Sequence, residues 1–145
     1  MNIDGIQNGY VIDHIQAGKA MLIYRYLRLD KLDCSVAIIK NAKSRRMGRK
    51  DIIKIDELIP VDLEILGYID PNVTVNIIRD GERVAKQHLA LPERVVNVIR
   101  CKNPRCITQV EQEIEHVFVL ADRDKGVYRC HYCEVAHKSE EKPEF

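Results

Sequence analysis

The chain has 145 residues, of which 46% are hydrophobic and 31% charged, a composition typical of a globular protein with one ordinary domain or two small ones. Its formal net charge is +1 and it contains no tryptophan, so no global positive field favours nucleic acid or an anionic membrane as a partner. The first residues are polar and no apolar run approaches the roughly 18 residues of a membrane span, so we expect a cytoplasmic protein without membrane segments.

The chain begins with a predicted strand and helix. Residues 10–15 are rich in β-branched side chains and predict a short strand. The polar pair Asp13 and His14 lies near the C-terminal end of this strand. A helix is expected over residues 17–29, because apolar residues recur there at helical spacing.

Two strands follow, at residues 33–39 and 49–55, and a polar turn over residues 41–48 joins them. The basic residues of this turn indicate a solvated loop. A second helix is expected after Pro60, because proline suits a first helical turn and Asp62 lies near the positive end of the helix.

Asp80 and Gly81 form the strongest short-range hairpin signal, and they join strands predicted at residues 73–78 and 82–88. The resulting order is strand, helix, strand, strand, helix, strand, with one further hairpin strand. This order is typical of a ferredoxin-like βαββαβ sandwich, an antiparallel sheet with both helices on one face. We therefore predict an α+β protein whose first domain, residues 1–92, has this fold.

Two close pairs of cysteines organise the second part of the chain. Cys101 and Cys106 form one pair, and Cys130 and Cys133 form the other after 23 intervening residues. Four thiolates at this spacing can occupy the corners of a tetrahedron, which is the geometry of a structural zinc site. Two disulfides or four free thiols are the alternatives, although a segment this small does not fold on apolar burial alone. Iron in an electron-transfer protein would use the same four thiolates.

Residues 93–145 are therefore predicted to form a small all-β, zinc-ribbon-like domain that binds one structural Zn²⁺ ion. Strands are expected at 112–121 and 126–129. The apolar segment 95–99 enters the first cysteine pair, either as the lining of a hinge between the domains or as an ordinary strand of the zinc domain. The remaining cysteine, Cys34, is predicted to be a small core residue.

Three lysines are candidates for binding an anion. Lys50 and Lys54 are four residues apart on one strand and therefore point to the same face, and Lys86 lies on another strand. If those faces coincide, the lysines could hold a triphosphate, with His14 and Asn76 as further donors. Alternatively, the lysines only protect an exposed sheet surface. The sequence shows no nucleophile with a base, no carboxylate pair and no open metal site, so no catalytic residue is predicted.

Several segments resemble, in order and spacing, the regulatory chain of aspartate carbamoyltransferase. They are residues 11–15, 47–55, 74–76 and 91–94 and the four cysteines Cys101, Cys106, Cys130 and Cys133. The resemblance implies a ferredoxin-like domain that forms a homodimer and binds nucleoside triphosphates, and a zinc domain that docks on the catalytic chain. It implies a non-catalytic allosteric subunit that binds CTP, ATP or UTP and transmits their effect to the catalytic chains in pyrimidine biosynthesis.

The resemblance also implies the residues of the effector site. The phosphates would be contacted by Lys50, Lys54, Lys86, His14 and Asn76, the ribose by Asp13, and the base by backbone groups around Ile6 and Gly81. Mg²⁺ bound with the nucleotide is a further expectation. The alternative function is a zinc-ribbon nucleic-acid-binding protein, but the zinc domain mixes acidic and basic residues, a poor surface for a phosphate backbone. We therefore expect no nucleic-acid partner.

Overall fold

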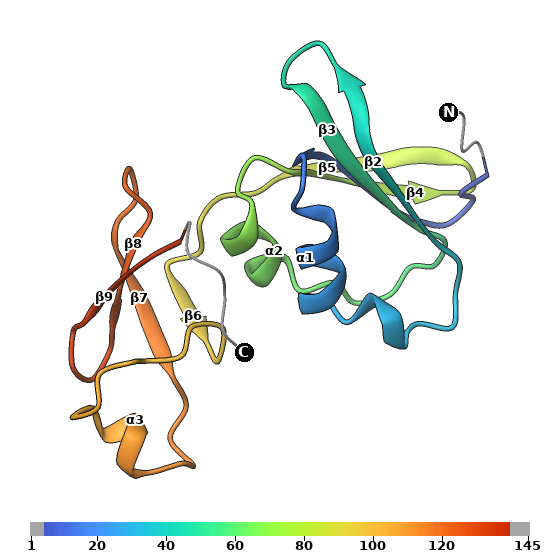
Figure 1. Cartoon of the computed structure of the whole chain (residues 1–145). Helices are drawn as coiled ribbons and strands as arrows, with labels where there is room; N and C mark the ends of the chain where they lie inside the picture. The colour runs from blue at the N-terminus through green and yellow to red at the C-terminus, as the bar shows by residue number, and fades with distance from the viewer. Residues whose placement is uncertain (1–4, 140–145) are drawn as a thin grey trace. The chain divides into compact units, whose positions relative to one another are not determined.

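The computed structural model describes residues 5–139 (Figure 1). The chain forms two compact units, Met1–Ala90 and Leu91–Phe145, whereas the sequence analysis sets the domain boundary after residue 92. Within the described residues, no helix is both long and apolar enough to cross a membrane.

The first unit contains a five-stranded antiparallel sheet in the order β2-β3-β1-β4-β5 (Figure 1). Its elements are β1 (Gly9–Gln16), α1 (Ala20–Tyr26), the 3-10 turn η1 (Leu29–Lys31), β2 (Val36–Ser44), β3 (Gly48–Ile55), α2 (Leu63–Ile69), β4 (Thr74–Arg79) and β5 (Glu82–His88). This order confirms the predicted ferredoxin-like βαββαβ sandwich, and β5 is the further hairpin strand.

One face of this sheet is buried. Its buried apolar residues are Ile12, Ile15, Ile53, Ile55 and Val75. Helix α1 contacts β3 and α2 and contributes Ala20 and Ile23 to the core. Because side chains alternate across a strand, the residues between these positions point to the opposite face, where the predicted anion-binding residues lie.

Helix α1 is shorter than the predicted helix over residues 17–29. Gly18 has a φ of 100°, which is incompatible with a right-handed helix, so the helix cannot begin before it. The buried carboxylate of Asp51 accepts hydrogen bonds from the backbone N–H groups of Gly18 and Ala20 and so caps the helix start. At the other end, Arg28 adopts the left-handed conformation with a φ of 54°, which stops the helix.

The sequence predicts that the second helix begins directly after Pro60, whereas α2 begins at Leu63. Asp62 is the N-cap, and its carboxylate accepts hydrogen bonds from the backbone N–H groups of Glu64 and Ile65. An N-cap of this kind stabilises a helix by about 1 kcal/mol, which favours a helix start at Asp62.

Strand β2 extends through residues 41–44, which the sequence analysis assigned to the turn. A bulge between Ile39 and Ala42 allows the strand to continue, and Asn41 within it has a φ of 58°. The backbone N–H of Asn41 donates to the Asp51 carboxylate over 2.9 Å, which stabilises the bulge. The polar turn is therefore confined to residues 45–47.

The Asp80 and Gly81 hairpin is confirmed. Both residues have positive φ, 51° and 79°, as a two-residue type I′ turn requires. The turn joins β4 and β5, whose register pairs Arg79 with Glu82.

The second unit contains a four-stranded antiparallel sheet in the order β6-β7-β8-β9. Its elements are β6 (Arg94–Val96), the one-turn helix α3 (Ile107–Val110), β7 (Val117–Asp122), β8 (Val127–Cys130) and β9 (Ala136–Lys138). The small all-β domain is confirmed, but β7 starts later than the predicted strand at 112–121. Neither α3 nor β9 was predicted, because segments of three or four residues are too short to show a periodic pattern.

Candidate functional site

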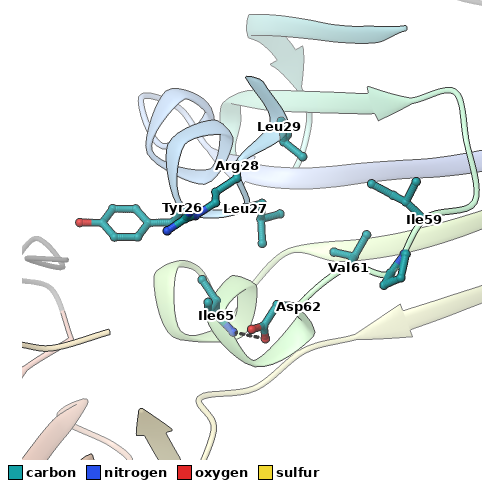
Figure 2. A pocket seen from close by; sticks show the side chains of 9 residues that line it. Tyr26, Leu27, Arg28, Leu29, Ile59, Val61, Asp62 and Ile65 are labelled. Carbon is teal, nitrogen blue, oxygen red and sulfur yellow. Dashed lines mark hydrogen bonds between the residues drawn. The ribbon is translucent and has the colours of Figure 1, made fainter. Parts of the chain in front are cut away.

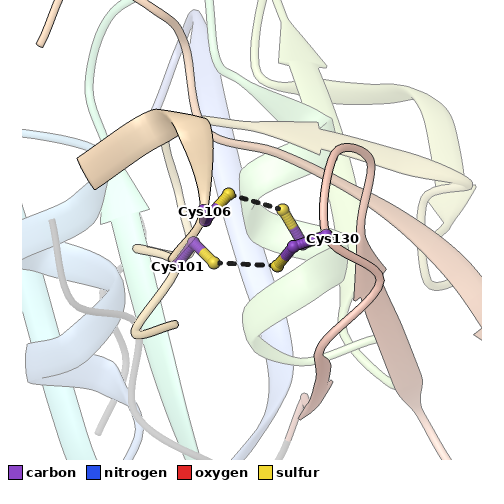
Figure 3. A group of neighbouring side chains, drawn as sticks. Cys101, Cys106 and Cys130 are labelled. Carbon is purple, nitrogen blue, oxygen red and sulfur yellow. Dashed lines mark hydrogen bonds between the residues drawn. The ribbon is translucent and has the colours of Figure 1, made fainter. Parts of the chain in front are cut away.

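The sulfur atoms of Cys101, Cys106, Cys130 and Cys133 lie within 4.8 Å of one another. The Sγ atoms of Cys101 and Cys133 are 3.5 Å apart, and those of Cys106 and Cys130 are 3.8 Å apart. Figure 3 shows that Cys101, Cys106 and Cys130 turn their sulfurs toward a common point. Four sulfurs about 2.3 Å from a tetrahedral zinc ion are about 3.8 Å from each other, whereas a disulfide measures about 2.05 Å. The cluster therefore fits a metal centre.

Short hydrogen bonds close the two cysteine turns. The backbone N–H of Cys106 donates to the carbonyl of Asn103 over 3.0 Å, and the side chain of Asn103 accepts from the N–H of Arg105. In the second turn, the N–H of Glu134 donates to the carbonyl of Cys130 over 2.9 Å. These bonds hold each cysteine pair in a tight loop with the sulfurs on its inner side.

His116 and Gln109 support the first cysteine turn, and sequence reasoning missed this role. The backbone N–H of Cys101 donates to His116 Nδ1 over 3.1 Å, and Gln109 Nε2 donates to the carbonyl of Cys101. Burial, and then the charge of Arg100, lower the pKa of His116, which keeps Nδ1 available as an acceptor. No periodic pattern in the sequence marks such contacts.

The thiols of the cluster are in an environment that disfavours uncompensated charge. Burial raises the pKa of the Cys101 thiol to about 12 and also raises that of Cys130. Burial acts in the same direction on Cys133, but hydrogen bonds from Val135 N–H and the Asn103 side chain lower its pKa to about 7. Three buried thiolates and a half-buried fourth, Cys133, therefore need a cation, and the donor set fits a bound metal ion.

The predicted anion-binding residues lie on the exposed face of the five-stranded sheet. The strand register places Lys54 opposite Val11, Val11 opposite Asn76, and Asn76 opposite Lys86, which makes one row across four strands. Adjacent strands are about 4.8 Å apart, so the backbones at Lys54 and Lys86 are roughly 14 Å from each other. The three lysines therefore do not share one position but occupy different parts of the face.

His14 is held rigidly at one end of this face. It lies in a bulge of β1 between Ile12 and Ile15 and has a φ of 61°. Its Nδ1 atom is 2.8 Å from Thr74 Oγ1, and its backbone N–H donates to the carboxylate of Asp13 over 2.6 Å. The ring orientation is therefore determined by a side-chain hydrogen bond as well as by the backbone.

Three cations act on His14: Lys50, Arg46 and Lys86. Burial is the largest cause that lowers the pKa of His14, and the charges of these cations lower it further, whereas Asp13 opposes them. We call His14, Lys50, Arg46 and Lys86 the His14 cluster. Its residues come from β1, from β5 and from the β2–β3 hairpin, so tertiary structure collects positive charge at this end of the sheet.

Asn76 lies in the row between Lys54 and Lys86. Its Nδ2 atom donates to the carbonyl of Val11 over 3.3 Å. Its Oδ1 atom is buried and has no hydrogen-bond partner among the described residues. Buried polar atoms are normally paired, so this oxygen can accept a donor from a bound molecule.

A pocket of about 240 Å³ lies at the opposite end of the face and is lined by Gly5, Ile6, Ser35, Val36, Ala37, Lys54 and Asp56. The β4–β5 turn adjoins the N-terminal segment, because the N–H of Gly81 donates to the carbonyl of Gln7 over 2.9 Å. The structure therefore brings Ile6 and Gly81 to one end and Asp13, His14 and Lys50 to the other. Lys54, which lines the pocket, and Lys86 lie in the same cross-strand row between these ends.

Sequence reasoning missed Thr74, Ala37 and Arg46 at this face. The pairing of Asp13 with Thr74 and of Lys54 with Ala37 follows from strand register, which becomes visible only once the strand order is known. Arg46 was set aside as part of a solvated turn.

A second pocket, of about 200 Å³, lies between the C-terminal end of α1 and the segment before α2 (Figure 2). Of the described residues that line it, only Arg28 is cationic. Figure 2 shows Asp62 turned toward its own helix, where it caps α2. With Arg28 as its single cation, this pocket offers less positive charge than the face that carries Lys50, Lys54 and Lys86.

Cys34 is half-buried, and burial, followed by the charge of Glu57, raises the pKa of its thiol. A raised pKa leaves little thiolate at neutral pH. Cys34 therefore has no feature of an activated nucleophile.

Two family models match the chain. The first, described as the allosteric domain of the aspartate carbamoyltransferase regulatory chain, matches residues 1–90, and the second, described as the metal binding domain of the same chain, matches residues 93–142. The chain is 49% identical over 138 residues to the aspartate carbamoyltransferase regulatory chain of Clostridium acetobutylicum, covering 95% of this chain and 94% of the relative. It is 48% identical to that of Clostridium tetani, covering 95% and 96%, and 42% identical to that of Bifidobacterium longum, covering 92% and 96%.

Proposed function

Because the chain belongs to the family of aspartate carbamoyltransferase regulatory chains, we propose that it binds nucleoside triphosphates and transmits their effect to the catalytic chains of the holoenzyme in pyrimidine biosynthesis. It is a regulatory, non-catalytic chain. The proposed effectors are CTP, ATP and UTP. Each effector shifts the quaternary equilibrium only by the difference between its affinities for the two states.

The His14 cluster is the observation that carries this proposal. It collects cations from the β2–β3 hairpin and from β5 around His14 of β1, and Asp13 is the carboxylate that opposes them. Ionised donors bind phosphate oxygens in short, strong hydrogen bonds, and several of them around one anion add geometric specificity. We assign Lys50, Lys86 and His14 to the phosphates, with Asp13 toward the ribose.

The pocket around Ile6 supports the location of the base. Its lining is mostly apolar, and backbone groups of the N-terminal segment and of the Gly81 turn lie beside it. A flat, mostly apolar base with a few polar edges fits such a pocket. Because Lys54 lines this pocket, we assign Lys54 to the base side, and Asn76 to the middle of the nucleotide.

The decisive test is calorimetric titration of the full chain, alone and in the holoenzyme, with CTP, ATP and UTP. We expect one nucleotide per chain and a shift of the aspartate saturation curve of the holoenzyme. Lys50→Gln and Lys86→Gln should weaken all three nucleotides. If the chain binds none of them, or if both variants bind like the parent, the proposed function is wrong.

For the cysteine cluster, we propose one structural Zn²⁺ ion held by Cys101, Cys106, Cys130 and Cys133. Four thiolates complete a tetrahedral zinc site and leave no position for substrate, so the ion would stabilise the fold without taking part in catalysis. Iron with the same ligands would give a coloured protein. Elemental analysis of the purified holoenzyme distinguishes the two metals.

We propose that the second unit docks on the catalytic chain. Exposed apolar side chains of this unit support this assignment, because a partner can bury them in a contact site. They are Ile107, Val110, Val119, Tyr132 and Val135. Co-purification of a stoichiometric catalytic chain from the native cell tests this proposal, and recovery of nucleic acid in its place would favour the zinc-ribbon nucleic-acid binder.

We also propose that the first unit pairs with a second copy of itself. The edge strand β2 carries the apolar residues 36–39, all half-buried in the single chain. An uncovered apolar edge strand invites pairing with another strand. Sedimentation equilibrium should give a dimer, and Ile38→Lys should shift the protein toward the monomer.

The expected Mg²⁺ ion is tested by measuring nucleotide binding to the same preparation with and without magnesium.

A further inference from the structure

Residues 91–93, which we call the connector, are the first residues of the second unit and are bound to its β7–β8 hairpin. Arg123 Nη1 donates to the carbonyl of Leu91 over 2.8 Å, and the hydroxyl of Tyr128 donates to the carbonyl of Pro92 over 2.5 Å. Arg123 lies in the turn between the two strands, and Tyr128 lies on β8. Two side chains distant in sequence therefore hold consecutive carbonyls of the connector.

Backbone contacts complete this attachment. The N–H of Leu120 on β7 donates to the carbonyl of Glu93 over 2.8 Å, and β6 then starts at Arg94 and pairs with β7. The side chain of Leu91 lies beside the same hairpin, because a Cβ atom added at Gly126 would be 3.8 Å from Leu91 Cδ1. The connector is therefore bound to the second unit along its whole length.

Tyr128 is a fixed point of this attachment. Its side chain is 0% exposed, so the ring is held by the core of the unit. Burial raises the pKa of Tyr128 to about 12, although the charge of Arg123 acts in the opposite direction. The hydroxyl is therefore protonated at neutral pH and can donate to the carbonyl of Pro92.

The first unit ends in an equally close contact. Gly67 of α2 lies against the backbone of Ala90, because a Cβ atom added at Gly67 would be 2.5 Å from the carbonyl oxygen of Ala90. Ala90 is the last residue of the first unit, and Leu91 is the first residue of the second. Consecutive residues are thus held by different units, which leaves no slack chain at this boundary.

We propose that the hinge between the units is confined to the junction of Ala90 and Leu91, and that Arg123 and Tyr128 are positioning residues that make the connector move with the second unit. Pro92 fixes its own φ and restricts Leu91 to extended conformations, so few backbone angles are free at the junction. This inference rests on the proposed function, because it names the residues that keep the nucleotide effect from being absorbed by a loose linker.

The matched variants are Arg123→Ala and Lys125→Ala. Both remove a cationic side chain from the same exposed turn, but Lys125 holds no part of the described connector. Tyr128→Phe removes the second bond and keeps the ring. Hydrogen exchange of the holoenzyme, followed within residues 91–96 and at Leu120, should be about twofold to tenfold faster in Arg123→Ala and Tyr128→Phe, the effect of one lost hydrogen bond on local opening. Lys125→Ala should exchange like the parent.

The functional readout is the shift that CTP causes in the aspartate saturation curve of the holoenzyme. Arg123→Ala should reduce this shift, while its metal content stays that of the parent and its CTP affinity stays within about twofold, because the substitution is distant from both sites. Insertion of two glycines between Ala90 and Leu91 should also reduce the shift, although it removes neither side-chain bond. Arg123 is exposed, so its truncation tests the inference even if Tyr128→Phe fails to fold.

Three results would overturn the inference: exchange in Arg123→Ala that matches the parent, a full CTP response in Arg123→Ala, or a full response after the glycine insertion. If the parent responds to CTP and these variants respond equally, the proposed function stands and only the role of the connector is wrong. If the parent responds to no nucleotide, the proposed function fails, and the inference that rests on it fails too.

Discussion

Lys50 Nζ lies 2.9 Å from Asp13 Oδ1, so this cation of the proposed phosphate site is ion-paired before any ligand binds. Both side chains are mostly buried, with 18% and 21% of their surface exposed. A bound phosphate must therefore compete with Asp13 for Lys50, and the apo site is less positive than its lysines suggest.

Asp13→Asn is expected to strengthen the binding of inorganic tripolyphosphate, an anion that has no ribose for Asp13 to contact. Releasing Lys50 from a partly exposed ion pair is worth up to about 1 kcal/mol, or about fivefold in affinity. Calorimetric titration of the full chain measures it, with Lys50→Gln as the opposite case. Weaker tripolyphosphate binding in Asp13→Asn would show that Asp13 does not compete with the ligand.

Lys86→Ala should weaken every nucleoside triphosphate by a similar factor. Lys86 pairs with Asn76 across β4 and β5, and its proposed role is to contact the phosphates that all three proposed effectors share. Losing a charge-assisted contact costs roughly 1.5–3 kcal/mol, or about tenfold to a hundredfold in affinity. Titration with CTP and ATP measures the loss, and Lys125→Ala, an exposed turn residue of the second unit, is the control. Unchanged affinity for both nucleotides would remove Lys86 from the site.

Lower pH should strengthen triphosphate binding through His14. In the free protein, burial holds the pKa of His14 below 6.5, so the ring is neutral at pH 7. A bound triphosphate favours the protonated ring and raises this pKa. The bound state then carries more protons, so affinity rises as pH falls through the pKa of the complex and levels off below that of the free protein.

His14→Gln is the control for this pH dependence, because the phosphates themselves also titrate in the same range. Calorimetry in buffers of different ionisation enthalpy counts the protons taken up on binding. The variant should take up fewer protons than the parent. Equal proton uptake by the two proteins would assign the pH dependence to the nucleotide alone.

Removing the metal should unfold the second unit and leave the first folded. Ordering such a small unit costs on the order of 1.5 kcal/mol per residue, which its core roughly balances, so a metal contribution of about 10–16 kcal/mol decides its stability. After treatment with a strong chelator, hydrogen exchange should lose protection within residues 91–139 and keep it within residues 5–90. Cys34→Ser should retain the metal, whereas Cys106→Ser should lose it. Full protection after complete metal removal would contradict the prediction.

Ile99→Ala is expected to destabilise the protein, and Val96→Ala is not. Ile99 is 1% exposed and Val96 is 39% exposed. Truncating a buried isoleucine costs about 2–5 kcal/mol, whereas an exposed substitution changes stability by about 0.5 kcal/mol or less. Thermal unfolding measures both, and an unchanged midpoint in Ile99→Ala would show that its surroundings collapse without cost.

This difference also decides how communication between the units should be tested. Residues 94–96 form strand β6, paired with β7, which supports the interpretation of segment 95–99 as part of the metal-binding unit. Val96 is exposed, so its side chain is free to contact another part of the holoenzyme. Val96→Ala in the holoenzyme therefore tests whether the segment transmits the CTP effect without loss of fold.

The sequence by itself determined the features that depend on neighbouring residues. The positive φ angles of Asp80 and Gly81 follow from a two-residue hairpin, for which this dipeptide is the strongest local signal. The four cysteines predict a metal site because the spacing between the ligands can be seen in the sequence itself. The βαββαβ order likewise follows from local periodicities, although the start of α1 does not, because its cap is Asp51, a residue far along the chain.

Only the tertiary structure decided which charges meet. Strand register separates Lys54 from Lys86, and the bulge between Ile12 and Ile15 changes the orientation of His14. The position of Lys50 beside Asp13 likewise requires the pairing of β1 with β3. These relationships arise from pairing between strands that are distant in sequence, where one bulge changes which face a side chain occupies, and no local pattern of residues encodes that choice.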